Sequence, residues 1–223
     1  MHNWFVYDEF DEVSKAASDF IAEKIEACLS MKEVCHVALP GGNSPITCLR
    51  YLAKKNLPWQ KIHWYLGDER CYPRSHNERN DVMLKKNFWS LIGSTNIHLI
   101  QSELGAEKAA ELYREEIASV DCFDIVFLGM GEDGHTASLF PKNKALNDSR
   151  SVIPVFDSPK PPSDRVSLSI DTLKNAQYRL VLTMGTSKTS VIKRIKSGEL
   201  LPINCIGDIN WFIDQDALSP VTN

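Results

Sequence analysis

Long apolar runs and an excess of basic charge are both missing from this sequence of 223 residues. No stretch approaches the roughly 18–20 consecutive apolar residues of a membrane-spanning helix, so we expect no membrane segment. The amino terminus is acidic and lacks a basic region followed by an apolar run, so we expect no secretory signal peptide. Acidic residues outnumber basic ones, 29 to 25, and the resulting net charge of -4 gives no general attraction to nucleic acid or anionic membranes. An anionic ligand therefore needs a local basic cluster.

Closely paired cysteines are missing as well. The six cysteines are scattered, with no Cys-x-x-Cys pair, and most lie in apolar patterns that are typical of small buried hydrophobic residues. We therefore expect no zinc site and no disulfide framework, and we predict a reducing, cytoplasmic location. What the sequence does have is the composition of a globular protein with a full core, because 43% of its residues are hydrophobic and 24% are charged.

Apolar runs alternate with amphipathic segments along the whole chain. The expected strands are 34–39, 62–66, 97–100, 123–128, 152–156, 166–170, 178–183 and 202–206, and the expected helices are 11–30, 44–53, 81–89, 103–118 and 186–197. This alternation predicts a mostly parallel sheet with helices on both faces. We find no internal repeat and no convincing linker, so residues 1–223 are predicted to form a single α/β domain.

Four polar loops come directly after expected strands. They are Gly41–Ser44, Asp68–Arg70, Gly129–His135 and Gly185–Lys188. Because the carboxyl ends of parallel strands lie on one edge of a sheet, we expect these loops to converge on a common site.

Two of these loops lie between a strand and the start of a helix. The free N–H groups of Gly41–Ser44 and the helix dipole favour an anion such as phosphate, although a simple tight turn fits the same pattern. Ser44 followed by Pro45 predicts a helix start in which the Ser44 hydroxyl can act as the cap. The segment Thr186–Lys188 has the same arrangement, with a lysine in the first turn.

Arginines crowd the loop that follows Asp68. Arg70, Arg74 and Arg79 lie close together in a chain of negative net charge, which favours an anion clamp. A solvated turn with local ion pairs fits the pattern too. Arg165, between a proline-rich loop and a strand, is a further candidate for binding an anion.

His135 is the best catalytic candidate in the sequence. It lies two residues after Asp133 in a glycine-rich loop that follows an apolar strand. An imidazole that is oriented by a carboxylate is the usual general base near neutral pH. Ser138 lacks the Gly-x-Ser-x-Gly surroundings of a nucleophile, so we do not expect it to act as one.

The same loop also matches the dinucleotide pattern Gly-x-Gly-x-x-Gly at Gly129–Gly134. A dinucleotide loop should open a long helix, whereas Pro141 interrupts this segment within two turns. Asp133 would also put negative charge where the pyrophosphate should lie. We interpret the match as coincidental, which leaves a nicotinamide-dependent dehydrogenase as a disfavoured alternative.

Four segments together resemble the 6-phosphogluconolactonase family, part of a superfamily that also holds glucosamine-6-phosphate deaminase. They are LPGGNSP (39–45), LGDERCYP (66–73), GMGEDGHTASLFP (129–141) and GTSK (185–188), in the family's order and across nearly the whole chain. The resemblance implies a single Rossmann-like domain without a metal or redox cofactor. It also implies hydrolysis of 6-phospho-D-glucono-1,5-lactone to 6-phospho-D-gluconate, in the oxidative pentose phosphate pathway.

The resemblance implies roles for particular residues as well. His135 is the expected base, and Asp133 is expected to assist it. The expected phosphate and substrate contacts are Gly42, Asn43, Ser44, Asp68, Arg70, Arg165 and Lys188. The sequence departs from the family at Arg79, which stands where a serine is common and puts the role of that loop in doubt.

Two further alternatives stay open at this point. The deaminases carry a GHIAFNEP-type segment, whereas this chain has GHTASLFP and lacks its carboxylate, so the lactonase is favoured over an isomerase or deaminase. A non-catalytic sugar-phosphate-binding module could dispense with the Asp133/His135 pair. The expected partner is a small sugar-phosphate lactone, with no nucleic acid and no membrane, and the expected assembly is a monomer or a small homo-oligomer.

Overall fold

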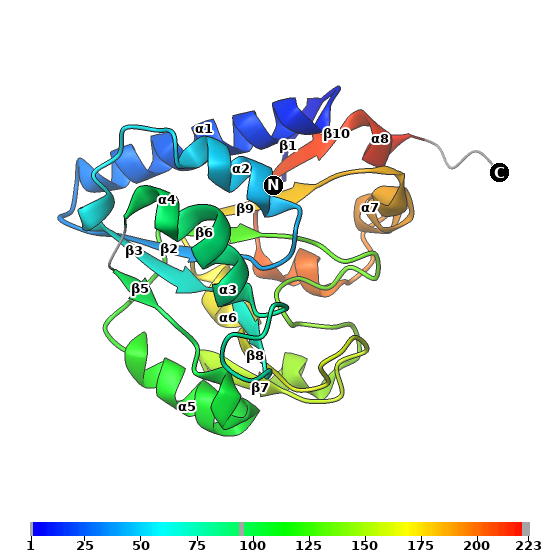
Figure 1. The fold of residues 1–223 in the computed structure, drawn as a ribbon. Helices are drawn as coiled ribbons and strands as arrows, with labels where there is room; N and C mark the ends of the chain where they lie inside the picture. The colour runs from blue at the N-terminus through cyan, green and yellow to red at the C-terminus, as the bar shows by residue number, and fades with distance from the viewer. Residues whose placement is uncertain (1, 94–95, 220–223) are drawn as a thin grey trace.

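The computed structural model describes residues 2–93 and 96–219, and its main sheet contains seven parallel strands. The strand order is β1-β10-β9-β6-β2-β3-β5 (Figure 1). In chain order the strands are β1 (Asn3–Tyr7), β2 (Cys35–Leu39), β3 (Ile62–Leu66), β5 (Ile97–His98), β6 (Ile125–Leu128), β9 (Tyr178–Thr183) and β10 (Asn210–Asp214). The predicted α/β class with a mostly parallel sheet is confirmed.

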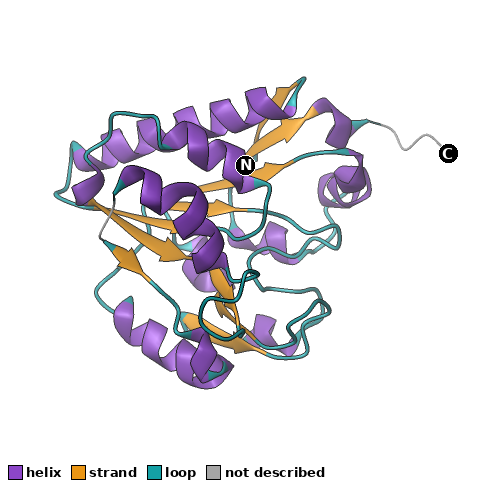
Figure 2. Ribbon diagram, viewed as in Figure 1, coloured by secondary structure: helices purple, strands orange, loops and turns teal. Residues whose placement is uncertain are grey.

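Helices cover both faces of this sheet (Figure 2). On one face, α1 packs against α2, and α2 packs against the helical segment that contains α3 and α4; α5 and α6 lie on the other face (Figure 1). The bounds are α1 (Phe10–Leu29), α2 (Pro45–Leu52), α3 (Asn80–Leu84), a π-helical turn (Lys85–Trp89), α4 (Ser90–Ile92), α5 (Ala106–Glu116), α6 (Ile170–Lys174), α7 (Thr189–Lys196) and α8 (Gln215–Leu218). No helix in the described ranges is long and apolar enough to cross a bilayer.

A small antiparallel sheet lies beside the main one. It consists of β4 (Asp68–Arg70), β8 (Arg165–Leu168) and β7 (Val152–Val155), in that order, and α5 packs against it. The strands predicted near 152–156 and 166–170 therefore exist, but they do not belong to the parallel sheet. Asp68–Arg70, expected to be a loop, is a strand whose three residues all pair with β8.

The prediction of a strand at 202–206 is wrong. Pro202–Ile206 forms a 3₁₀ helix that packs against α6, and Leu201, Ile203 and Ile206 are buried. The apolar run is explained by burial against a helix, and Pro202 has no N–H to donate to a strand ladder. The last strand is β10 instead.

The edge strand β1 and its neighbour β10, neither of which was expected from the sequence, share the triplet Asn-Trp-Phe. The triplets pair in register, so that Trp4 stacks on Trp211 and Phe5 on Phe212, each with ring centroids 4.9 Å apart. Stacked aromatic pairs across neighbouring strands stabilise a sheet. The aromatic residues of the two triplets therefore help to hold this pair of strands together.

The direction in which strands are added reverses between β2 and β6. β3 lies on the outer side of β2, and β9 lies on the outer side of β6. Both central strands are almost wholly buried, which matches their apolar sequences. In open α/β sheets such a reversal opens a crevice beyond the carboxyl ends of the two strands.

Candidate active site

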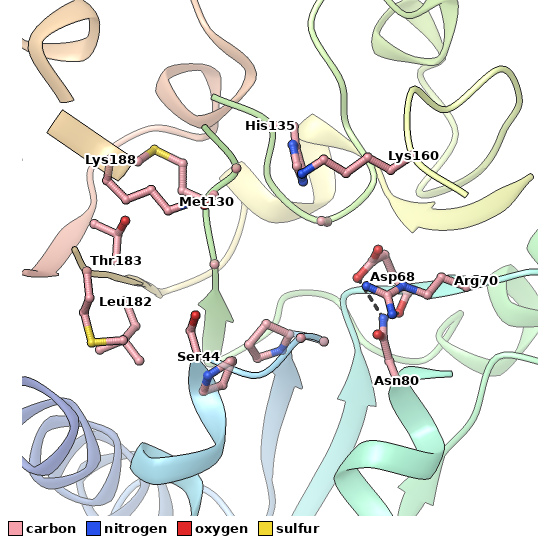
Figure 3. Close-up of a pocket in the computed structure, with 18 of the residues that line it drawn as sticks. Ser44, Asp68, Arg70, Asn80, Met130, His135, Lys160, Leu182, Thr183 and Lys188 are labelled. Atoms are coloured by element: carbon pink, nitrogen blue, oxygen red, sulfur yellow. Dashed lines mark hydrogen bonds between the residues drawn. The ribbon is translucent and has the colours of Figure 1, made fainter. Parts of the chain in front are cut away.

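A pocket of about 230 Å³ lies at this point of reversal (Figure 3). It is lined by the loops after β2, β6 and β9, by β4, and by the start of α3. The lining residues are Pro40, Gly41, Gly42, Ser44, Pro45, Asp68, Arg70, Asn80, Gly129, Met130, Gly131, His135, Ala137, Lys160, Arg165, Leu182, Thr183, Met184 and Lys188. The predicted convergence of the four polar loops is therefore found.

The loop after β2 brings main-chain atoms to the pocket. Gly42 has a φ of +83°, a conformation that glycine adopts without strain. A Cβ on Gly41 would lie 1.9 Å from Asn80 Oδ1, so only glycine allows this close approach. Ser44 precedes α2, but its side chain makes no capping hydrogen bond, so the predicted cap is wrong while Pro45 does begin the helix. The Ser44 hydroxyl is left facing the pocket.

The loop after β6 holds His135 and Asp133 together. His135 Nδ1 lies 2.5 Å from Asp133 Oδ1, and the His135 N–H donates to the same oxygen at 3.2 Å. A Cβ on Gly131 would lie 2.1 Å from the imidazole, so the ring and this main-chain segment need the glycine to pack. With Nδ1–H donated to Asp133, the Nε2 lone pair is available to accept a proton.

The surroundings of His135 favour its neutral form. The ring packs on Phe140 with centroids 4.5 Å apart. Burial lowers the pKa of His135 below its usual value, and the nearby carboxylate of Asp133 only partly offsets this. Burial would raise the pKa of Asp133, but the imidazole outweighs it and the pKa is lowered. An ionised Asp133 beside a neutral His135 is the state expected of a general base near pH 7.

Lys188 reaches the pocket from the loop after β9. The segment Thr186–Lys188 is a 3₁₀ turn rather than the first turn of the expected helix, and Gly185 before it has a φ of +83°. Lys188 Nζ donates to the carbonyl of Met130 at 2.9 Å, and burial lowers the pKa of this lysine. The buried Thr183 hydroxyl also lines the pocket and has no hydrogen-bond partner among the described residues.

The three clustered arginines divide into two groups. Arg70 lines the pocket, where its Nη1 donates to the carbonyl of Glu78. Arg74 pairs with Glu103, and the buried Arg79 pairs with Asp81 and Glu103. The predicted three-arginine clamp is therefore wrong, because carboxylates already satisfy two of the three. Arg79, which departs from the family pattern, holds the loop instead of lining the site.

Buried acids fix the wall formed by β4 and α3. Glu69 accepts hydrogen bonds from the N–H groups of Arg70, Asn80 and Asp81, at 2.8, 2.8 and 2.9 Å. Burial raises the pKa of Glu69 to about 7 despite these bonds. Asp68 accepts from Ser138 Oγ at 2.6 Å and from Asn80 Nδ2 at 3.2 Å. Ser138 is thus a buried donor to Asp68, in line with the expectation that it is no nucleophile.

Arg165 is buried at the pocket wall, but most of its donors are engaged. Its Nε and Nη2 donate to the carbonyls of Pro162, Lys160 and Pro161, at 3.3, 3.2 and 3.1 Å. Its guanidinium also lies over the Phe140 ring, 5.5 Å from the centroid. Arg165 therefore connects the proline-rich loop to the ring that supports His135.

Most of the site residues expected from the sequence come together. The expected residues that line the pocket are Gly42, Ser44, Asp68, Arg70, His135, Arg165 and Lys188. Asp133 is not in the lining but contacts the His135 ring. Asn43 is not among the lining residues. The residues that sequence reasoning missed are Asn80, Lys160 and Thr183. Asn80 directly follows Arg79, whereas Lys160 and Thr183 carry no local signal.

Possible metal ligands gather elsewhere. Within the described part of the chain, the group close enough to share a cation is Cys28, Cys35 and Asp124. It lies near the amino ends of β2 and β6, at the edge of the sheet opposite the pocket. Lys32 forms an ion pair with Asp124, and burial raises the pKa of both thiols. Cys28 and Cys35 are buried, as expected of small hydrophobic residues, and the group lies away from the pocket.

The fold and the pocket define a class of protein: a single α/β domain with a paired imidazole and carboxylate beside cations at the switch point of its sheet. Residues 8–211 match the family of glucosamine-6-phosphate isomerases/6-phosphogluconolactonase. The chain belongs to this family.

Three matches illustrate the similarity. The 6-phosphogluconolactonase of Thermotoga maritima is 35% identical over 193 residues, which cover 82% of this chain and 86% of that protein. The crystal structure of 6-phosphogluconolactonase from Thermotoga maritima has a TM-score of 0.90 at 29% identity, covering 96% of this chain and 100% of that one. The GDH/6PGL endoplasmic bifunctional protein of Homo sapiens is 35% identical over 226 residues, or 92% of this chain, but this chain spans only 28% of that protein.

Proposed function

We propose that this protein hydrolyses 6-phospho-D-glucono-1,5-lactone to 6-phospho-D-gluconate, in the oxidative pentose phosphate pathway. The observation that carries the proposal is the His135–Asp133 pair, with its 2.5 Å contact, in a pocket that also holds Arg70 and Lys188. Such a pocket offers a base for water and cations for a phosphate. Relatives named 6-phosphogluconolactonase support the same reaction.

His135 acts as the general base in this proposal. A 1,5-lactone is an activated ester, so water can attack C1 without a covalent enzyme intermediate. Nε2 of His135 takes a proton from the water as its oxygen bonds to C1, and the imidazolium returns the proton to the ring oxygen when the C1–O5 bond breaks. Asp133 orients the ring and stabilises its charged form. General base catalysis of this kind contributes about 10²–10⁴-fold to the rate.

The substrate phosphate binds to groups of the pocket other than His135. We assign it to the main chain of Gly42 and Asn43, the Ser44 hydroxyl, and the cations of Arg70 and Lys188. Amide groups at the start of α2 favour an anion, and charge-assisted hydrogen bonds from lysine and arginine strengthen its binding. Asp68 can accept hydrogen bonds from sugar hydroxyls, and Arg165 holds the wall. Binding the remote phosphate positions C1 near His135.

A deaminase is the alternative that shares the family name. The residues after His135 are Thr136, Ala137, Ser138, Leu139 and Phe140, none of which carries a carboxylate. The Ser138 hydroxyl in this segment is already donated to Asp68. The lactonase is therefore the better match to this site.

A coupled assay tests the proposal. Freshly generated lactone is supplied with 6-phosphogluconate dehydrogenase, and the rate is compared for wild type, His135→Ala and no enzyme. Acceleration by wild type that is lost in His135→Ala, with unchanged thermal unfolding, supports the assignment. A well-folded wild type that gives no acceleration, or that releases ammonia from glucosamine 6-phosphate instead, rejects it.

We also propose a cytoplasmic location and a small-molecule substrate, without nucleic acid or membrane as a partner. The six cysteines are all free thiols, which a reducing compartment maintains.

A further inference from the structure

The loop at 157–164 is fixed in shape by its own hydrogen bonds. The Ser158 N–H donates to the carbonyl of Ser163 at 3.0 Å, and the Ser158 hydroxyl donates to the carbonyl of Lys160 at 3.0 Å. Arg165 donates to three successive carbonyls of the same loop, including that of Lys160. A buried arginine thus holds the main chain from which the Lys160 side chain extends.

The side chain of Lys160 points into the pocket towards His135 (Figure 3). Lys160 is an exposed residue, yet its side chain lies along the pocket instead of extending into solvent. Within residues 2–93 and 96–219, its Nζ makes no hydrogen bond and no ion pair. Its charge opposes protonation of His135 and of Lys188, so the ammonium group is electrostatically close to both.

We propose that Lys160 is a catalytic residue, whose ammonium group binds the C1 carbonyl oxygen of the lactone and stabilises the negative charge that forms there. The inference rests on the proposed lactonase function and deepens it. As the water oxygen bonds to C1, the electron pair of the C1–O double bond moves to the carbonyl oxygen. The double bond re-forms when the C1–O5 bond breaks. A cation at the carbonyl oxygen lowers the energy of the intermediate state and leaves the proton transfers to His135.

In the close-up view, Lys160 comes from a different side of the pocket than Lys188 and Ser44, two of the proposed phosphate contacts (Figure 3). Lys160 lies beside the imidazole in the same view. A water activated by His135 attacks a carbon within about 3–3.5 Å, so the oxygen on that carbon lies within reach of a cation next to the ring. A positive charge here also helps to keep His135 in its neutral, basic form.

Steady-state kinetics of three variants test the inference. Lys160→Met removes the charge at similar length, Lys160→Arg keeps it, and Lys144→Met is the matched control, an exposed lysine outside this pocket. Loss of one donor to an oxyanion lowers kcat by about 10²–10³-fold. We expect a fall of this order for Lys160→Met with KM changed by less than about threefold, a smaller fall for Lys160→Arg, and wild-type constants for Lys144→Met.

Two results overturn the inference. If Lys160→Met keeps the wild-type kcat, whether or not KM rises, Lys160 does not stabilise the reacting oxygen and at most attracts the phosphate. If Lys160→Arg loses as much activity as Lys160→Met, the charge is not the property that matters. Both results leave a wild type that hydrolyses the lactone, so they are distinct from failure of the proposed function, which is an inactive wild type.

Discussion

The two glycine loops at the centre of the sheet make different contributions to the pocket. The loop after β2 brings main-chain N–H groups and the Ser44 hydroxyl, with no acid or imidazole. The loop after β6, on the neighbouring strand, brings His135 and Asp133. We propose that the loop after β2, the binding loop, serves binding and that the loop after β6, the catalytic loop, serves chemistry.

The glycines of the two loops also pack against different side chains. Gly41 allows the Asn80 side chain to approach the main chain of the binding loop, whereas Gly131 allows the imidazole to approach the main chain of the catalytic loop. Similar glycine-rich sequences thus satisfy unrelated packing needs. This difference can be tested by changing one loop at a time.

The largest expected effect is the loss of kcat when the catalytic loop is changed. His135→Asn removes the base and retains a polar side chain of smaller size, so kcat should fall by about 10²–10⁴-fold. The phosphate contacts are untouched, so KM should change little. A variant that retains more than about a third of the wild-type kcat would contradict the assignment of His135 as the base.

The next largest loss of kcat is expected from a methyl group on Gly131. Gly131→Ala places a Cβ against the His135 ring, and a displacement of about 1 Å in a catalytic group can cost about 10²-fold in rate. Gly67→Ala is the matched control, because Gly67 is not among the lining residues of the pocket, a Cβ there comes no closer than 3.5 Å to its nearest neighbour, and φ is not positive. Equal kcat values for the two variants would show that the packing of Gly131 against the imidazole is unimportant.

Changes to the proposed phosphate contacts should mainly affect the affinity for substrate. Lys188→Met removes a cation, and a hydrogen bond to a charged group contributes about 1.5–3 kcal/mol, so KM should rise by about 10–100-fold. Lys193→Met, an exposed lysine on α7 outside the pocket, is the control for the loss of one charge. Unchanged KM in Lys188→Met would exclude this lysine from the phosphate site.

The smallest effect concerns pH. In the proposed mechanism His135 works as a neutral base, so kcat/KM should rise with pH through the pKa of His135, which burial lowers below its usual value. Asp133 raises that pKa, so Asp133→Asn should move the acid limb to lower pH as well as reduce the plateau. An acid limb that moves to higher pH in Asp133→Asn would contradict the described coupling.

The central loops could be predicted from the sequence because their strands are continuous apolar runs that end at glycines. β4 could not, since Asp68 and Glu69 are polar residues buried by contacts to Ser138 and to distant main-chain N–H groups. The pairing of Arg79 with Glu103 likewise depends on residues far apart in the sequence. Lys160 reaches the pocket from a loop whose carbonyls accept hydrogen bonds from Arg165, so no local pattern could have identified it.

The most direct test of the proposed separation of binding from chemistry is calorimetric binding of 6-phospho-D-gluconate to wild type, His135→Asn and Lys188→Met. We predict a Kd within about threefold of wild type for His135→Asn and a Kd at least about tenfold weaker for Lys188→Met. Weaker binding in His135→Asn together with unchanged binding in Lys188→Met would contradict the separation of binding from chemistry.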